Sequence, residues 1–245
     1  MAEMTDDVLA ALAPTGTLRA AINLGNSVLA QQGADGALQG VSVDLTNELA
    51  RRLGRAAAFT SFEAAGKAFE ALKTGDCDIA FLANEPARAA EVDFTPAYVL
   101  IEGTYMVRID SPLKEPADVD RAGIRIAVGP NSAYDLYLTR TLKHATIVRA
   151  AKGGGRAMID LFLAQNLEAA AGVRQPLEDY ARTDSGVRVM AGRFMEIRQS
   201  MALQKGRPAG LRYLRNFVEE MKASGFIAGA LRRSGQEATV APPEA

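Results

Sequence analysis

The chain has 245 residues, of which 48% are apolar and 23% are charged, and its formal net charge at pH 7 is -1. This composition is typical of a globular protein large enough for one sizeable domain or two smaller lobes. The near-zero charge gives no reason to expect nucleic acid or an anionic membrane surface as a partner. Cys77 and His144 are the single cysteine and the single histidine, so no internal disulfide can form and a zinc site is disfavoured. We expect no metal, no cofactor and no catalytic residue.

The N-terminal stretch 1–16 begins with acidic residues and lacks the basic start and the apolar core of a secretory signal. No apolar run approaches the roughly 20 residues that a membrane-spanning helix needs, so no membrane insertion is expected. The protein is therefore expected to be periplasmic if a signal peptide is missing from this chain, and cytoplasmic otherwise.

Residues 17–83 are predicted to alternate strands with helices. The pattern runs strand 17–24, glycine-rich loop 25–40, helix 41–54, strand 56–62, helix 66–75 and strand 76–83. Such alternation is typical of a parallel sheet with helices on its faces.

The same alternation restarts further along the chain. It runs strand 105–108, strand 123–129, helix 132–142, strand 145–150, helix 156–165, strand 167–173, helix 176–182 and strand 187–190, then strand 200–206 and helices 209–225 and 226–235. The tail 236–245 has no core pattern and is expected to be mobile.

The restart predicts an α/β fold of two lobes. Lobe 1 would comprise residues 1–99 and 198–245, and lobe 2 residues 100–197, because the last strand and helices most simply complete the first sheet. Ligands of open α/β sheets bind beyond the carboxyl ends of the strands, so a ligand cleft is expected between the lobes.

A lone arginine, Arg88, follows the predicted strand 76–83 in the segment "NEPARAAEVDFTPAY". It is either a surface residue paired with Glu85 or Glu91, or a cleft residue that holds an anion. A guanidinium group can bind a carboxylate through two parallel hydrogen bonds.

A second anion-binding feature is predicted in "GPNSAYD", residues 129–135. Ser132 followed three residues later by Asp135 is typical of a capping box at a helix start. Backbone N–H groups at the N-terminus of a helix favour an anion, so this helix start is a candidate binding element as well as a structural one.

Five segments occur in a characteristic order: "GTLRAAI", "GVSVDLTNELARRLG", "EALKTGDCDIAF", "RAAEVDFTPAY" and "IAVGPNSAYDLYL". Together they resemble the periplasmic solute-binding proteins of polar amino-acid ABC transporters, the family 3 group with the type II two-lobe fold. The resemblance covers about residues 15–235. It implies a monomer that closes around a small anionic or zwitterionic solute by hinge bending and presents it to an ABC transporter permease, without catalysis.

The resemblance also implies site residues. Arg88 would bind the α-carboxylate of the ligand, and the turn of Asn131, Ser132, Ala133 and Tyr134 would close on the same group. The remaining candidates follow strand ends: Asn26, Asn84 and Arg174.

The sequence departs from the family pattern at several of these positions. Asn26 stands near the place of an aromatic residue that often stacks on the ligand, and Asn131 replaces a usual glycine. Arg174 stands where an acid would bind the α-ammonium group. A carboxylate or dicarboxylate without that amine therefore fits better than an α-amino acid, unless Glu85 supplies the missing acid.

Two alternatives remain open from the sequence. One is an enzyme similar to cyclohexadienyl dehydratases, which share this architecture and need a general acid in the cleft. The other is a cytoplasmic ligand sensor, suggested by the absence of a visible signal peptide.

Overall fold

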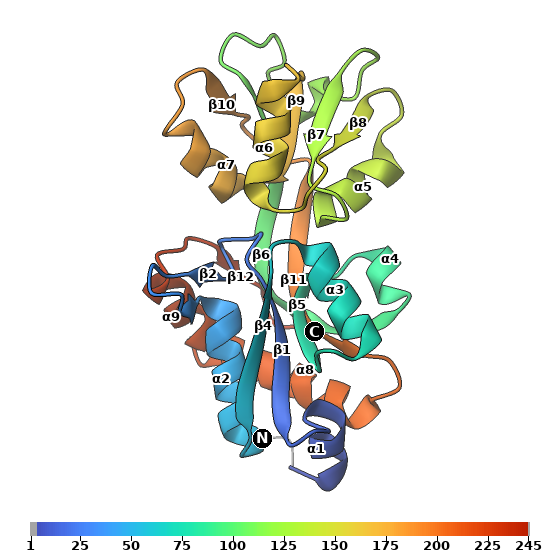
Figure 1. Cartoon of the computed structure of the whole chain (residues 1–245), viewed down its shortest axis with the longest axis vertical. Coiled ribbons are helices and arrows are strands. Elements are labelled where there is room, and N and C mark those ends of the chain that lie inside the picture. Colours follow the sequence, from blue (N-terminus) through green and yellow to red (C-terminus); the bar gives the residue numbers. More distant parts are fainter. Residues whose placement is uncertain (1–3, 245) are drawn as a thin grey trace. The chain divides into compact units, whose positions relative to one another are not determined.

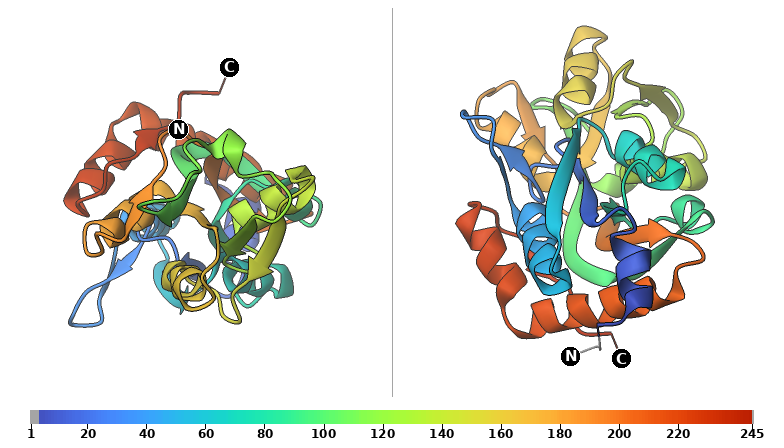
Figure 2. Two further views of the ribbon diagram at one scale, coloured as in Figure 1. Left: turned by 90° about the horizontal axis from the view of Figure 1, so that it is seen from above. Right: turned by 60° about the horizontal axis from the view of Figure 1, so that its bottom comes forward.

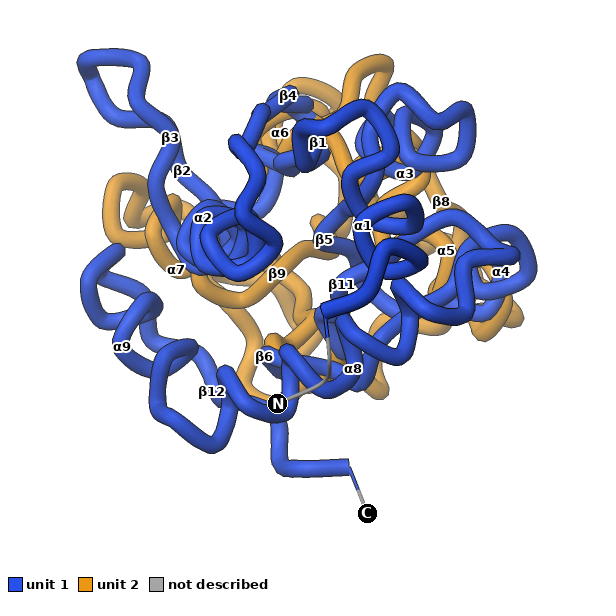
Figure 3. The backbone as a smooth tube through the Cα atoms, turned by 90° about the horizontal axis from the view of Figure 1, so that it is seen from below, with its two compact units in different colours: residues 1–63, 67–100, 198–245 blue, residues 64–66, 101–197 orange. Residues whose placement is uncertain are grey.

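The computed structural model describes residues 4–244. The chain divides into two compact units (Figure 3): unit 1 comprises residues 1–63, 67–100 and 198–245, and unit 2 comprises residues 64–66 and 101–197. Both units contain sheets with helices packed on them (Figure 1). No helix among the described residues is both long enough and apolar enough to span a bilayer.

Unit 1 is built on strands in the order β4-β1-β5-β11-β6, with β12 paired to β6. β1 runs parallel to β4 and β5, and β11 is antiparallel to β5. The elements are α1 (Asp6–Leu12), β1 (Thr17–Asn23), β2 (Gln31–Gln32), β3 (Leu38–Gln39), α2 (Val41–Leu53), β4 (Ala56–Phe62), α3 (Ala65–Thr74), β5 (Ile79–Ala83), α4 (Pro86–Ala89), β6 (Val92–Arg108), β11 (Met195–Gln204), α8 (Pro208–Ala223), α9 (Phe226–Arg233) and β12 (Thr239–Val240). Helices α1 and α8 lie side by side (Figure 2).

The apolar patterns of unit 1 have direct structural counterparts. All five residues of β5 are buried, as expected of a central strand covered on both faces. Helix α2 buries Val41, Leu45, Leu49 and Leu53, because residues four apart lie on one face of a helix. It ends at Gly54, whose φ of 62° is the left-handed conformation that glycine adopts without a Cβ clash.

A buried ion pair joins β1 to the segment that leads into β5. Asp78 is fully buried, and its carboxylate accepts hydrogen bonds from the backbone nitrogen of Arg19 at 3.0 Å, from Nε at 3.0 Å and from Nη2 at 2.7 Å. A buried carboxylate is tolerated only when it is paired in this way. The pair therefore helps to set the position of β5 against β1.

Unit 2 has the strand order β6-β9-β7-β8, with β10 paired to β6. β7 is parallel to β8 and β9, whereas β6 is antiparallel to β9 and β10. The elements are β7 (Arg125–Val128), α5 (Ala133–Thr141), β8 (Thr146–Arg149), α6 (Gly155–Ala164), β9 (Ala169–Val173), α7 (Arg174–Ala181) and β10 (Val187–Val189), with a 3-10 turn at Pro116–Asp118. In the hydrophobic core of unit 2, Met158, Ile159 and Phe162 of α6 pack in one cluster with Leu177 of α7.

The strands and helices expected from apolar periodicity are present in their predicted order. Several features differ from the predictions. Helices α1 and α4 and the small hairpin β2-β3 were not expected, and the predicted short strand at 105–108 is the end of the 17-residue strand β6.

The prediction of a mobile tail is wrong for the residues that the structure describes. β12 pairs with β6 at Val99 and Leu100, and the amide of Ala241 donates to the carbonyl of Tyr98 at 3.1 Å. The buried ammonium of Lys222 donates to the carbonyls of Ala97, at 3.3 Å, and Pro242, at 3.0 Å. The local sequence of the tail contains no sign of these long-range bonds.

We expect Lys222→Met to loosen the tail, because it leaves two carbonyls of a buried site without their donor. The loss in unfolding free energy should be about 1 to 3 kcal/mol, and hydrogen exchange at the Ala241 amide should accelerate. Lys205→Met is the matched control, since Lys205 is exposed and donates to the Ala90 carbonyl at 2.7 Å. Unchanged exchange at Ala241 in Lys222→Met would contradict this role.

Candidate functional site

The candidate residues of unit 1 follow the carboxyl ends of two adjacent strands. β1 and β5 are parallel neighbours, so their carboxyl ends lie at the same edge of the sheet. Asn26 follows β1, and Asn84 and Arg88 follow β5. This is the edge at which open α/β sheets bind ligands.

Arg88 lies in the short helix α4 and is only 2% exposed. Its Nη1 donates to the carbonyl of Ala83 at 3.3 Å. Burial lowers the pKa of the Arg88 guanidinium to about 10, although the nearby charge of Glu85, itself buried, acts in the opposite direction. Arg88 is therefore still a cation at neutral pH, held largely away from water.

The alternative of a surface arginine paired with Glu91 is wrong. Arg88 is buried, and the carboxylate of Glu91 pairs with Lys73 at 2.6 Å.

The two asparagines of unit 1 differ in their roles. Asn26 is buried, and its Oδ1 accepts from the amide of Val28 at 3.3 Å, which shapes the loop after β1. Asn84 is exposed and donates its backbone N–H to the carbonyl of Arg198 at 2.9 Å. The side chain of Asn26 is thus engaged within its own loop.

The candidate residues of unit 2 also follow adjacent parallel strands, β7 and β9. Ser132 caps helix α5, since its hydroxyl accepts from the amide of Asp135 at 3.1 Å. The return bond differs from a regular capping box, because Asp135 accepts from the amide of Asn131 at 2.8 Å. Asn131 has a φ of 57°, a conformation that asparagine tolerates better than most residues with a Cβ.

Two further buried side chains, those of Asp135 and Tyr134, stabilise the turn before α5. The carboxylate of Asp135 is buried and pairs with Arg149 at 2.9 Å. Tyr134 is also buried, and burial raises the pKa of its phenol. Its Oη lies so close to Gly129 that a Cβ at that position would be only 3.0 Å away. Tyr134 therefore supports the turn with its side chain, and Ala133, also buried, adds a backbone N–H to the first turn of the helix.

Arg174, the first residue of α7, is engaged within unit 2. Its Nε contacts Glu102 at 2.6 Å, and Nη1 lies 3.5 Å from Glu178. The same guanidinium donates to the carbonyls of Met190, at 3.3 Å, and Gly192. Glu102 was not singled out from the sequence, although an acid inside the apolar run "YVLIEGTYMV" is the signal that could have revealed it.

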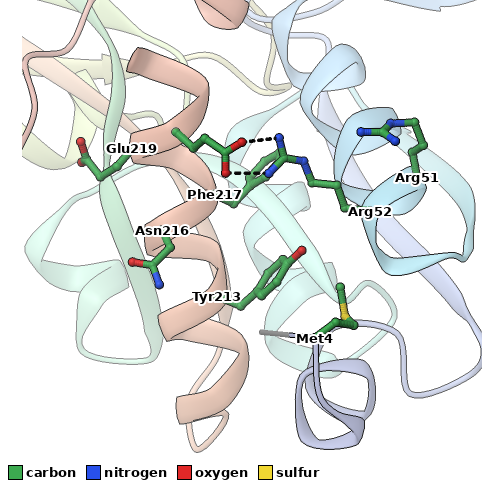
Figure 4. A pocket seen from close by; sticks show the side chains of 8 residues that line it. Met4, Arg51, Arg52, Tyr213, Asn216, Phe217 and Glu219 are labelled. Carbon is green, nitrogen blue, oxygen red and sulfur yellow. Dashed lines mark hydrogen bonds and ion pairs between the residues drawn. The ribbon is translucent and has the colours of Figure 1, made fainter. Parts of the chain in front are cut away.

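A hollow of about 880 Å³ lies on unit 1 between α2 and α8 (Figure 4). It is lined by Met4, Arg51, Arg52, Tyr213, Asn216, Phe217, Glu219 and Glu220. Arg52 contacts Glu220 at 2.8 Å and Glu48 at 2.7 Å, and lies 5.3 Å from the ring centre of Phe217. These two carboxylates neutralise the cation of Arg52, so the hollow offers little attraction to an anion.

Among residues 4–244, no group of three or more His, Cys, Asp and Glu side chains is arranged to hold a metal ion. Cys77 is buried, and burial raises the pKa of its thiol, which disfavours the thiolate that a nucleophile or metal ligand requires.

Residues 18–235 match the family model of bacterial extracellular solute-binding proteins, family 3. The chain belongs to this family. Its mixed α/β architecture of two units matches that of two-lobe periplasmic-binding proteins, so the predicted type II fold is confirmed. No match to this solute-binding protein was found among curated protein sequences.

Solved structures of similar fold cover nearly the whole chain at low identity. A solute receptor for L-cysteine of Neisseria gonorrhoeae has a TM-score of 0.80 and 21% identity, covering 93% of each chain. An amino acid ABC transporter substrate-binding protein from Streptococcus pneumoniae, bound to L-arginine, has a TM-score of 0.77 and 18% identity, covering 97% of this chain and 100% of its own. The ancestral amino acid-binding protein AncCDT-1, a precursor of cyclohexadienyl dehydratase, has a TM-score of 0.76 and 22% identity, covering 92% and 97%.

The charged cluster beside the hollow should make the stability of this solute-binding protein depend on pH. Hydrogen bonds from Arg51, and more weakly from Arg52, lower the pKa of Glu48 from 4.5 to about 2 against the effect of burial. A depressed carboxylate pKa stabilises the folded state above the unfolded-state pKa, and this stabilisation is lost as the pH falls through the folded-state value.

We therefore expect the stability difference between the wild type and Glu48→Gln to be constant above about pH 5 and to shrink towards pH 2. Urea denaturation at a series of pH values measures it. Glu91→Gln is the control, because the Lys73–Glu91 pair is exposed and should contribute little at any pH. A difference for Glu48→Gln that does not change with pH would contradict the assigned pKa.

Proposed function

We propose that this protein binds a small carboxylate-bearing solute, either an amino acid or a related organic acid, and delivers it to the permease of an ABC transporter in the periplasm. Binding would occur by hinge closure of the two units. Membership of the solute-binding family supports the role in solute binding. The buried guanidinium of Arg88 is the reason for proposing that the solute bears a carboxylate.

The environment of Arg88 explains why an anion is expected there. A cation that is only 2% exposed has lost most of its hydration, and its lowered pKa reflects that cost. A ligand carboxylate would add a charge-assisted pair to this guanidinium in a low-dielectric setting. Arginine suits this role better than lysine because its planar group can donate two parallel bonds.

Unit 2 would supply a second set of donors. The candidates are the hydroxyl of Ser132 and the backbone amides of Ala133 and Tyr134, at the positive end of the α5 dipole. Asn131 and Asp135 hold the turn that presents them. A solute that contacts both sets would bind the closed state more tightly than the open one and would therefore shift the population towards closure.

The proposed solute class follows from Arg174. It stands where the family resemblance implies an acid for an α-ammonium group, and it is paired with Glu102. We propose a solute without that amine, or an amino acid whose ammonium meets Glu85. A thermal-shift panel of L-cysteine, L-arginine, L-lysine, L-glutamine and small mono- and dicarboxylates would separate the two classes.

A second candidate function is a dehydratase activity, favoured by the similarity to AncCDT-1, the precursor of cyclohexadienyl dehydratase. The proposal of a binding protein without catalysis is preferred, because the residues after β9 are Arg174, Gln175 and Pro176 and none of them is a general acid. Incubation with prephenate or arogenate, followed by product absorbance, tests this alternative.

Arg88→Ala should weaken binding of the best solute from the panel by about 2 to 5 kcal/mol, or roughly 30-fold to several-thousand-fold. The reason is that the ligand carboxylate would lose its charge partner in a buried setting. Arg88→Lys should recover part of the loss, because the charge returns without the planar fork. Calorimetric titration of the three proteins measures the effect.

Arg212→Ala provides a control, since Arg212 is an exposed arginine on α8 and its loss should leave the affinity unchanged. A folded Arg88→Ala protein that binds as tightly as the wild type would overturn the carboxylate assignment. An unfolded Arg88→Ala protein would mean that the arginine is structural, and the assignment would lose its main support.

A further inference from the structure

The outer strand of the unit 1 sheet, β4, has an open edge. β4 (Ala56–Phe62) is the last strand at one end of the sheet. Among the strands that the structure describes, β1 is its one partner. It is seven residues long, and Ala56, Ala58, Thr60 and Ser61 are exposed. An edge of this length exposes a row of unpaired backbone donors and acceptors.

The register with β1 shows which backbone groups point outward. The amide of Leu24 donates to the carbonyl of Phe62 at 2.8 Å, so the backbone groups of Phe62 point towards β1. Alternate residues of a strand direct their N–H and C=O groups to the same side. The N–H and C=O groups of Ala57, Phe59 and Ser61 therefore point away from β1.

This edge lacks the features that usually protect an outer strand. Its sequence, "AAAFTSF", has no charged residue, proline or glycine, whereas natural edges are often short or carry charges or proline. The outer strand of unit 2 is different: β8 (Thr146–Arg149) has four residues and ends on Arg149, which is paired with Asp135.

The charges that flank β4 are complementary to a second copy of the same strand. Arg55 precedes β4 and Glu63 follows it, and both are exposed. In an antiparallel pair centred on Phe59, Arg55 of each copy lies opposite Glu63 of the other, and Ala57 lies opposite Ser61. The outward backbone groups then face one another as hydrogen-bonded pairs. A parallel pair in register would instead place Arg55 beside Arg55.

We propose that two copies of this protein associate through their β4 edges in an antiparallel pair about a two-fold axis. The contact is self-complementary, so it closes after two copies and does not propagate into a filament. The seven-residue contact is small compared with a standard protein interface, so the dimer is weak and depends on concentration. This inference is independent of the ligand, and it differs from the monomer that the family resemblance implies.

Charge exchange at the two flanking positions tests the proposal. Sedimentation equilibrium at low ionic strength, over a range of protein concentrations, should give a monomer–dimer equilibrium for the wild type. Arg55→Glu or Glu63→Arg alone places like charges at both ends of the pair and should raise the dimer Kd about tenfold or more. The double variant Arg55→Glu/Glu63→Arg should restore the wild-type Kd.

Arg212→Glu, an equal charge change at an exposed site on α8, should leave the Kd unchanged. Circular dichroism confirms that each variant is folded. A wild type that stays monomeric at the highest concentration would overturn the proposal. A dimer that neither single variant weakens, or that the double variant fails to restore, would overturn it as well.

Discussion

Strand β6 is the constraint on which both compact units depend. Its 17 residues run from unit 1 into unit 2. β12 pairs with it at residues 99–100, and β9 and β10 pair with it along residues 103–108. A change that broke β6 would therefore remove strand pairings from both units at once. In unit 1, the buried ammonium of Lys222 donates to the β6 carbonyl of Ala97, and β12 pairs with β6 at residues 99–100. Both interactions stabilise the part of β6 that belongs to unit 1.

The two units use the same topology to present different chemistry. Each has two adjacent parallel strands whose carboxyl ends are followed by candidate binding residues, β1 and β5 in one and β7 and β9 in the other. Unit 1 places the buried cation of Arg88 there, and unit 2 places the capped start of α5. A guanidinium and a helix N-terminus both favour a negative group, which is why we propose one carboxylate-bearing solute for both.

The sequence predicted features that depend on neighbouring residues, such as helices and their caps. It did not predict contacts between residues far apart in the chain. The spacing of Leu45 and Leu49 and the stop at Gly54 predict α2, and the Ser132 cap lies three residues from its partner amide. The docking of β12 joins residues about 140 apart, and no apolar pattern in the tail indicates it. The Arg174–Glu102 pair likewise spans 72 positions, so the sequence identified Arg174 as a departure but not its partner.

We propose that one solute engages Arg88 and the start of α5 together, which requires the two units to close on it. Small-angle X-ray scattering, with and without a saturating concentration of the best solute from the thermal-shift panel, measures this closure. We expect a smaller radius of gyration when the solute is bound. An unchanged radius of gyration, at a concentration that calorimetry shows to be saturating, would contradict it.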